Sequence, residues 1–316
     1  MLSYRHAFHA GNHADVLKHF ALCLVLQKLK EKNKPFSVFE SHAGGGIYST
    51  ESDMALKTGE ITGGIKKLLE LSDTCTSGMN STKDIPESLK PYIALCKKYA
   101  EQNLYPGSPE IERCFMTEND SLVLCELHNT EIEVLKTNMK KKPHYPTENG
   151  NNVKPQIHHR SGYEALAALM PPKIRRGLAL IDPSYEEKSD YSDAAKAICE
   201  AHKKWNNGII MLWYPLLAHR TQEIANMKRT ITAAAQTGTI CETLDVQLLI
   251  NTPDSHTETS LEEASGSKNP RLYGSGLFFI NPPYMIKEQI ESALPFLAEN
   301  LGVEGHGSFA IKATGV

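Results

Sequence analysis

The sequence predicts an α/β fold built on a mainly parallel sheet. Short apolar runs with the length of buried strands recur along the chain, and longer segments with helical periodicity separate them. This alternation is typical of parallel sheets flanked by helices. The runs predicted to be strands are residues 36–39, 121–125, 178–181, 209–213 and 277–280.

The first predicted element is an amphipathic helix over residues 12–32. Asn12 can cap its first turn, Asp15 follows three residues later, and apolar side chains then recur at helical spacing. Pro35 ends the helix and the first strand begins directly after it.

The chain is predicted to form one main domain interrupted by a helical insertion. Residues 1–48 supply the N-terminal helix and the start of the domain, residues 49–105 the inserted helical subdomain, and residues 106–316 the remainder. Two segments, 143–155 and 252–269, are rich in polar and turn-forming residues and are predicted to be loops.

Composition narrows the functional class. Apolar residues make up 41% and charged residues 22% of the 316, which is ordinary for a soluble globular enzyme and argues against disorder. Seven scattered cysteines without a CxxC pair indicate reduced thiols, the N-terminus has no signal-peptide pattern, and the longest apolar stretch, 208–217, is too short to span a membrane. We expect a cytoplasmic protein without membrane contact and, by default, a monomer.

Charge alone does not indicate a partner. The net charge is −3, and basic residues gather only in local runs, which are more often solvated surfaces than phosphate contacts. These runs lie within residues 28–34, 136–142, 158–160 and 175–176.

Two predicted strands end in residues that suit a nucleotide-like ligand. Residues 44–46 are three consecutive glycines, which let the backbone approach a ligand closely, although such a run is also common in flexible turns. Glu126 closes the next strand, where an acidic residue either binds a ribose diol or caps the following helix.

Two similar tetrapeptides follow apolar strands: one begins at Asp182 and reads Asp-Pro-Ser-Tyr, and one begins at Asn281 and reads Asn-Pro-Pro-Tyr. Motifs of this kind hold the exocyclic amine of a nucleobase for methylation. The carboxylate and the proline carbonyl accept its N–H groups and free the nitrogen lone pair, while the aromatic ring of Tyr185 would stack on a flipped base. In isolation each motif could also be a plain strand-end turn.

Chain order favours the first motif. Only 32 residues follow Tyr284, too few for the rest of a sheet, and the glycines near the C-terminus have no predicted helix behind them. A glycine loop, then an acid, then Asp182 and further strands is the order of an unpermuted methyltransferase sheet. We therefore expect Asp182 to lie in the active site and Asn281 to be a structural strand end.

A metal site is the weaker alternative. His9 and His13 are four residues apart, but Gly11 and Asn12 lie between them and make a continuous helix carrying both doubtful. No HExxH or CxxC motif supports such a site, and methyl transfer from a sulfonium needs no metal.

The chain resembles the RlmJ family of bacterial 23S rRNA adenine-N6 methyltransferases. The resemblance covers almost the whole chain apart from the two polar loops, and its N-terminal block is highly specific. It is carried by residues 1–6, 8–19, 42–44, 58–60, 105–109, 126–128, 175–177, 181–183, 213–215 and 280–283.

The resemblance implies a Rossmann-like class I S-adenosylmethionine methyltransferase sheet with a small helical insertion, no metal, and one adenine of 23S rRNA as substrate (adenine 2030), modified before the ribosome is complete. It implies that Asp182 is the catalytic residue that accepts the hydrogen bond of the amine. Tyr4 is implied as a second residue that contacts RNA, in addition to Tyr185. The cofactor-binding residues that it implies are His19, His42, Ser108, Glu126, Ser161, Gly162 and Asp182.

Two departures from the family pattern leave alternatives open. Ser161 stands where the family has aspartate before glycine, and Ser184 stands where the motif has its second proline. The second change frees one backbone angle in a loop that benefits from rigidity. The alternatives are a nucleic-acid-binding protein linked to the use of external DNA, with weak or lost catalysis, and a DNA adenine-N6 methyltransferase.

Overall fold

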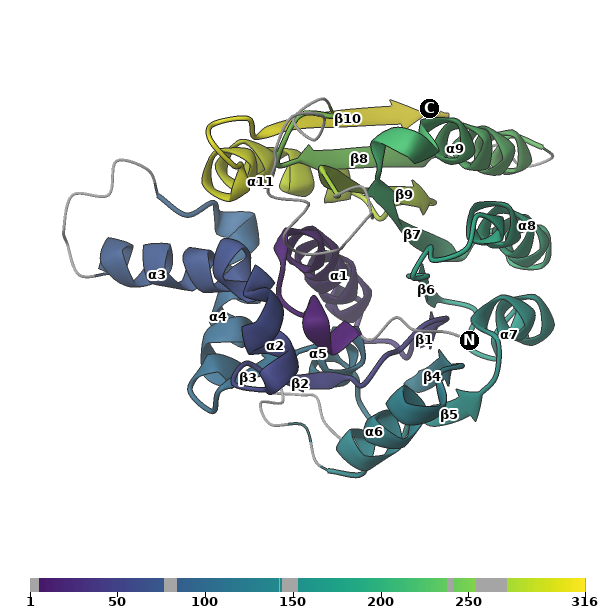
Figure 1. Cartoon of the computed structure of the whole chain (residues 1–316). Helices are drawn as coiled ribbons and strands as arrows, with labels where there is room; N and C mark the ends of the chain where they lie inside the picture. Colours follow the sequence, from purple (N-terminus) through teal and green to yellow (C-terminus); the bar gives the residue numbers. More distant parts are fainter. Residues whose placement is uncertain are drawn as a thin grey trace.

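The computed structural model describes residues 6–76, 84–141, 143, 153–237, 241–253 and 272–315. Its centre is an eight-stranded sheet in the order β10-β8-β9-β7-β6-β1-β4-β5 (Figure 1). The strands are β1 (Ser37–Glu40), β4 (Ser121–Glu126), β5 (Gln156–His159), β6 (Gly177–Ile181), β7 (Ile209–Leu216), β8 (Thr243–Leu249), β9 (Gly274–Ile280) and β10 (Ser308–Thr314).

The first half of the sheet is parallel and the second half is antiparallel. Strands β5, β4, β1, β6 and β7 all run in one direction. Strand β9 runs against β7, β8 runs against β9, and β10 runs against β8. The predicted α/β class is confirmed, and the crossovers leave β1 in opposite directions toward β4 and β6, which creates a switch point between β1 and β6.

Helices cover both faces of the sheet. One face carries α7 (Gly162–Leu169), α8 (Ser189–Lys204) and α9 (Thr221–Ala235). The other carries α1 (His13–Glu31), α5 (Ser108–Phe115) and α11 (Ile286–Leu301), while α6 (Asn129–Lys140) lies beside the edge strand β5 (Figure 1). Each face has its own apolar core, and between them they bury every residue of β6 and β9.

Helix α1 begins where its cap predicts. The side chain of Asn12 accepts hydrogen bonds from the backbone N–H groups of Ala14 and Asp15, each at 3.0 Å. The helix is buried along most of its length because it crosses the sheet and packs against α5, α11 and β9. Charged side chains in its first two turns are therefore enclosed together with the apolar ones.

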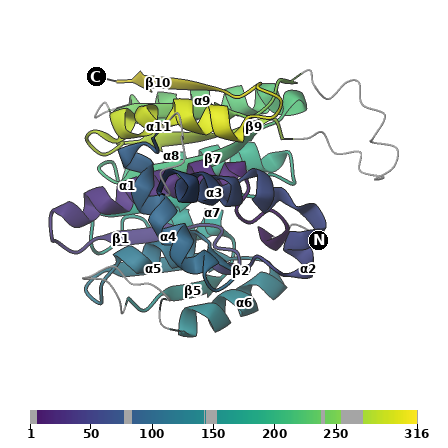
Figure 2. The same ribbon diagram turned by 90° about the vertical axis from the view of Figure 1, so that its left-hand side faces the viewer.

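The described residues between 49 and 104, which are 49–76 and 84–104, are mostly helical and lie to one side of the sheet (Figure 2). Its ends are joined by a two-stranded sheet of β2 (Ile47–Ser49) and β3 (Leu104–Pro106). Between these strands lie α2 (Asp53–Thr58), η2 (Glu60–Gly63), α3 (Ile65–Thr76), η3 (Glu87–Leu89) and α4 (Lys90–Ala100). Two further 3-10 helices are η1 (His6–Phe8), before α1, and η4 (Ala218–Arg220), before α9.

Candidate active site

The carboxyl ends of four neighbouring strands bring most of the predicted site residues to one edge of the sheet. The register pairs Glu40, the last residue of β1, with Leu124 of β4 and Leu180 of β6, and it pairs Glu126 with His159 of β5. The segments that follow these strands therefore lie side by side. They contain His42, Glu126, Ser161, Gly162 and Asp182.

The glycine segment after β1 is a tight loop held by Glu126. Gly44 and Gly46 have positive φ angles of 57° and 77°, which favour glycine. The backbone N–H of Gly44 donates to Oε2 of Glu126 at 2.8 Å, and Oε1 of Glu126 accepts from the N–H of His128 at 2.7 Å. Each carboxylate oxygen has a second lone pair, so Glu126 can still accept hydrogen bonds from a diol.

Asp182 is held by a buried lysine that the sequence reasoning missed. Nζ of Lys18, on α1, lies 2.5 Å from Oδ2 of Asp182 and 2.9 Å from Oδ1 of Asp15. The Lys18 and Asp15 side chains are 4% and 2% exposed, whereas Asp182 is 13% exposed and reaches the surface. Within the described residues Oδ1 of Asp182 accepts no hydrogen bond, so this oxygen can face a substrate.

Lys18 and Asp15 hold each other in their charged forms. Burial alone would lower the pKa of Lys18, but the carboxylates of Asp15 and Asp182 outweigh it and raise that pKa. Burial likewise acts to raise the pKa of Asp15, yet His6 and Lys18 hold it well below its usual value. His6 contributes a contact of 2.9 Å from Nε2 to Oδ2 of Asp15.

A pair of fully buried carboxyl groups lies behind the glycine loop. Ser108, the first residue of α5, donates a hydrogen bond from its hydroxyl to Oε1 of Glu40, while Oε2 of Glu40 and both carboxyl oxygens of Glu112 have no hydrogen-bond partner within the described residues. Burial raises the pKa of Glu40 to about 8 and raises that of Glu112 well above its usual value. Ser108 thus lies next to the end of β1, as a cofactor contact there requires.

The two predicted histidines are neutral but differ in position. Burial lowers the pKa of His42 to about 4; its Nδ1 bonds the Ser41 hydroxyl at 2.7 Å, and its ring meets the edge of Tyr163. Burial lowers the pKa of His19 to about 3, and its Nδ1 bonds the Tyr105 hydroxyl at 2.7 Å. His42 therefore lies on the site edge, whereas His19 is 1% exposed behind it, and both remain predicted cofactor ligands.

Ser161 and Gly162 form the start of α7. The Ser161 hydroxyl accepts from the backbone N–H of Glu164 at 3.5 Å and so caps the helix. A Cβ atom at Gly162 would collide with the carbonyl oxygen of Ser41, so glycine is needed for this close approach to the end of β1. The pair lies at the predicted edge, although the capping role of Ser161 uses its side chain within the protein.

Tyr185 is packed inside the protein. Its ring is 6% exposed, lies 4.5 Å from that of Tyr191 between centroids, and its hydroxyl donates to the carbonyl of Trp213 at 3.0 Å. Its φ angle of 54° is unusual for a tyrosine and turns the chain sharply after Ser184. Base stacking by Tyr185 stays a prediction and requires its ring to leave this packing; Tyr4 lies outside the described residues.

The second tetrapeptide lies at the opposite edge. Because β9 runs against β7, Ile280 pairs with Ile210 near the start of β7, and Asn281 is therefore remote from the end of β6. The Asn281 side chain donates to the carbonyls of Asn206 and Gly208 at 2.8 and 2.9 Å. This structural role favours Asp182 over Asn281 as the substrate-facing residue.

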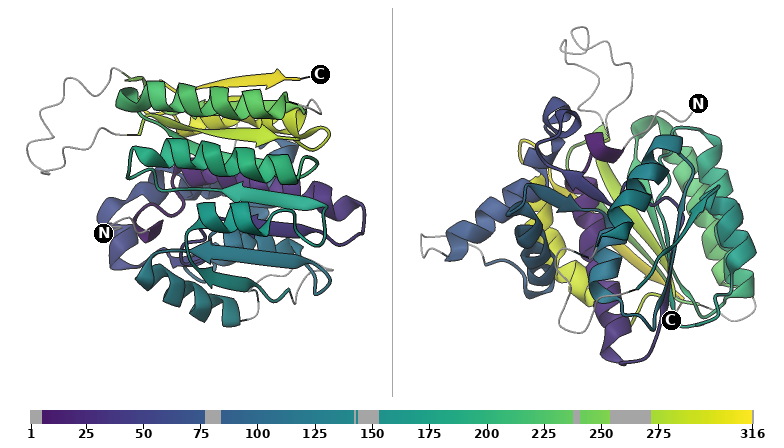
Figure 3. Two further views of the ribbon diagram at one scale, coloured as in Figure 1. Left: turned by 90° about the vertical axis from the view of Figure 1, so that its right-hand side faces the viewer. Right: turned by 90° about the horizontal axis from the view of Figure 1, so that it is seen from below.

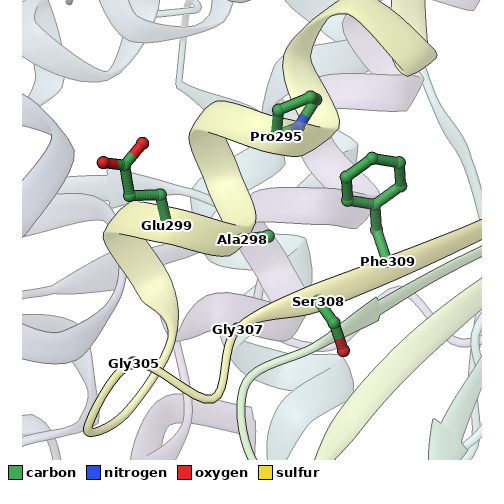
Figure 4. A pocket seen from close by; sticks show the side chains of 7 residues that line it. All are labelled: Pro295, Ala298, Glu299, Gly305, Gly307, Ser308 and Phe309. Carbon is green, nitrogen blue, oxygen red and sulfur yellow. The ribbon is translucent and has the colours of Figure 1, made fainter.

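Other features do not offer a competing site. A surface hollow of about 510 Å³ between α11 and β10 is lined by Pro295, Glu299 and Phe309 among others, and Glu299 points away from Phe309 (Figure 4). It contains none of the predicted site residues. Among the described residues, no group of histidine, cysteine or acidic side chains is arranged to hold a metal ion, and no helix is both long and apolar enough to cross a membrane.

Comparisons with known proteins agree with this architecture. Residues 33–313 match the family model described as "Ribosomal RNA large subunit methyltransferase D, RlmJ". Proteins named ribosomal RNA large subunit methyltransferase J from Escherichia coli and Haemophilus influenzae are 36% and 35% identical, over 99% of this chain and 98% of each relative. The crystal structure of the Legionella pneumophila protein LPL1258 is 30% identical and superposes with a TM-score of 0.77, covering 97% of this chain and 98% of that one.

Proposed function

This chain belongs to the RlmJ family of ribosomal RNA large subunit methyltransferases, and on that premise we propose that it methylates the N6 amine of one adenine of 23S rRNA with S-adenosylmethionine. The observation that carries the chemistry is the place of Asp182. Its carboxylate follows β6 at the switch point beside β1, is anchored by Lys18 through Oδ2, and leaves Oδ1 without a hydrogen bond within the described residues.

The residues at this edge fit the cofactor. S-adenosylmethionine, when bound, supplies a methyl group on a positively charged sulfur, and it also carries an ammonium group and a ribose diol. Glu126 and Asp182 give the edge acidic groups for such a cation, and the glycine loop leaves room for close backbone contact. In the proposal Glu126 holds the ribose. The cofactor is surrounded by His42, Ser108, Ser161 and Gly162, and His19 supports this pocket from its buried position behind the site.

Asp182 performs the proton chemistry of the proposed reaction. The N6 amine of adenine is a poor nucleophile because its lone pair is delocalised into the ring. Oδ1 of Asp182 accepts one N–H and the carbonyl of Pro183 accepts the other, which favours a lone pair directed at the methyl group. As the new N–C bond would form, the methyl–sulfur bond would break and leave a neutral thioether, and one N6 proton would pass to Oδ1 and from there to water.

Lys18 positions this carboxylate. A side chain that bonds Oδ2 fixes the direction of Oδ1, and a cation within 2.5 Å keeps the carboxylate from turning toward the solvent. Because Lys18 is itself held by Asp15, the orientation of Asp182 depends on the first turns of α1.

The test is methyl transfer from labelled cofactor to protein-free 23S rRNA, with duplex DNA in parallel. We expect label in the RNA only, at a single adenine identified by mass spectrometry of nuclease fragments. The Asp182→Ala variant should lose transfer and keep its fold, and the Asn281→Ala variant serves as the matched control that retains the chemistry. Full activity of Asp182→Ala, or loss confined to Asn281→Ala, would move the site to the second motif.

The alternatives give different results in the same assay. A DNA methyltransferase labels the duplex, and a binding protein without catalysis retains both nucleic acids without labelling either. The cytoplasm, where ribosomal RNA is made and assembled in bacteria, is the proposed location.

A further inference from the structure

The edge of the sheet opposite Asp182 gathers two features that the proposed reaction leaves unused. One is the exposed turn from Asn281 to Met285, and the other is the set of basic residues that precede the parallel strands. Strand order makes them neighbours, since the end of β9 and the starts of β7, β6 and β1 are adjacent along this edge. In Figure 3 (left) the turn after α1 projects from this edge, away from η1.

Hydrogen bonds tie these segments into one surface. Asn281 bonds the carbonyl of Gly208, the indole N–H of Trp205 donates to the carbonyl of Arg175 at 2.7 Å, and Arg176 donates to the carbonyl of Lys34 at 2.7 Å. Sequence-distant basic runs are thereby joined into one row, which we call the basal row. Its exposed cations are Lys32, Lys34, Lys173, Arg175 and Lys203.

The cations of the basal row are available to a partner. None of the five forms an ion pair within the described part of the chain. Of the acidic groups at this edge, Glu31 pairs with Lys28, Asp120 binds the backbone N–H groups of Phe36 and Thr117, and Glu242 and Glu288 lie beside the turn from Asn281 to Met285. Glu118 is exposed close to Asp120 in sequence, so the charge of this edge changes from positive to negative at the start of β4.

An aromatic ring stands at the other end of the row. Tyr284 is 84% exposed, the largest exposure among the big apolar side chains of the described residues. Its backbone is rigid, because two prolines precede it, Asn281 is anchored by two carbonyls, and Asn281 and Met285 have positive φ angles of 54° and 68°. A ring fixed in solvent next to a row of cations has the composition of a single-stranded nucleic-acid contact.

We propose that the basal row and Tyr284 bind a segment of the substrate RNA that flanks the target adenine, with the cations on phosphates and the ring on an unpaired base. This inference rests on the proposed function. Arg176 and Asp182 are six residues apart along β6, or about 20 Å at 3.3 Å per residue. A duplex arm of about six base pairs at about 3.4 Å each spans that distance.

The experiment measures binding and methylation of a long 23S rRNA fragment and of a short oligonucleotide that carries the target adenine alone. Lys34→Gln/Arg175→Gln removes two cations from the row, and Lys66→Gln/Lys67→Gln removes two exposed cations from α3 as the matched control. We expect the first variant to bind the long fragment about 5- to 20-fold more weakly. The slope of its log binding constant against log salt concentration should become shallower by the amount that roughly two phosphate contacts contribute. KM for the long fragment should rise with kcat unchanged, and the short oligonucleotide should be unaffected.

Tyr284 is tested separately. Tyr284→Ala should weaken binding of the long fragment about 5-fold or more, whereas Tyr284→Phe should retain it, because stacking needs only the ring. Unchanged binding of the long fragment in both the charge and Tyr284→Ala variants overturns the inference while leaving methylation by Asp182 standing. A wild-type protein that transfers no methyl group, but whose RNA binding still depends on the row, overturns the proposed function and keeps the row as an RNA contact. An equal loss for duplex DNA and RNA overturns the assignment to RNA.

Discussion

Replacing Lys18 tests whether the buried ion cluster positions Asp182. Lys18→Met removes the cation that lies 2.9 Å from Asp15 and 2.5 Å from Asp182 and leaves two carboxylates facing an apolar side chain. Breaking a buried pair from one side typically costs about 3–5 kcal/mol. Since Asp182 is partly exposed, we expect about 3 kcal/mol, which corresponds to a decrease of roughly 6–12 °C in Tm.

The assay is urea unfolding at pH 7 alongside methyl transfer. The double variant Lys18→Met/Asp15→Asn should recover at least half of the lost unfolding free energy, because the repulsion between the carboxylates disappears, but it should not recover activity, since Asp182 stays unanchored. The pKa of Asp15 in the folded protein lies below its unfolded value, so its stabilisation is present above about pH 4 and is lost as the pH falls further. The gap between Lys18→Met and wild type should therefore narrow in acid. A loss under about 1 kcal/mol at pH 7, or full activity, would refute the reasoning.

Four further predictions concern the same region. Because burial lowers the pKa values of His19 and His42 to about 3 and 4, below their unfolded value, stability measured by denaturant titration should fall from pH 6.5 to 4 by about 3 kcal/mol for each histidine, and His42→Gln should flatten that fall. Burial raises the folded-state pKa values of Glu40 and Glu112 above their unfolded values, so the folded protein loses stability as the pH rises from about 4.5 to 8. Glu112→Gln should therefore raise Tm at pH 9 relative to wild type and change it little at pH 5. Gly162→Ala should lower stability by about 1–3 kcal/mol and weaken cofactor binding in calorimetry, as its Cβ meets the Ser41 carbonyl. Ser184→Pro restores the rigid motif and should raise kcat without changing cofactor affinity; a lower kcat would show that the serine is needed.

The strands at the centre of the sheet can be predicted from the sequence, whereas most of those near its edges cannot. Apolar runs identify β1, β4, β6, β7 and β9 because these strands are buried on both faces. The predictions omit β5, β8 and β10, since they lie in the outer part of the sheet and mix polar with apolar residues. The chain after Asn281, which is too short for the rest of a methyltransferase sheet, forms one helix and one strand, α11 and β10, and neither was predicted.

The order of the site residues along the chain could be predicted from the sequence, but the side-chain contacts between distant residues could not. Glu126 and Asp182 follow strands, so their shared edge can be inferred from the topology. Lys18 binds a partner 164 residues away, and no local pattern specifies that contact. The available signal is that Asp15 and Lys18, three residues apart, are charged and alternate with the apolar residues of the first turns of a buried helix.

The position of α1 also has a consequence for how the chain is made. This helix leaves the ribosome before the sheet, and while α4 and α5 can cover part of its apolar surface early, the rest is covered by β9 and α11, which are among the last described elements to be synthesised. Leu301 is synthesised 270 residues after Glu31, which takes about 14–54 s of translation at roughly 5–20 residues per second. A nascent chain therefore exposes the part of α1 that β9 and α11 cover for that time, and chaperone depletion should lower its soluble yield more than that of proteins whose first helix packs only against its nearest neighbours in sequence.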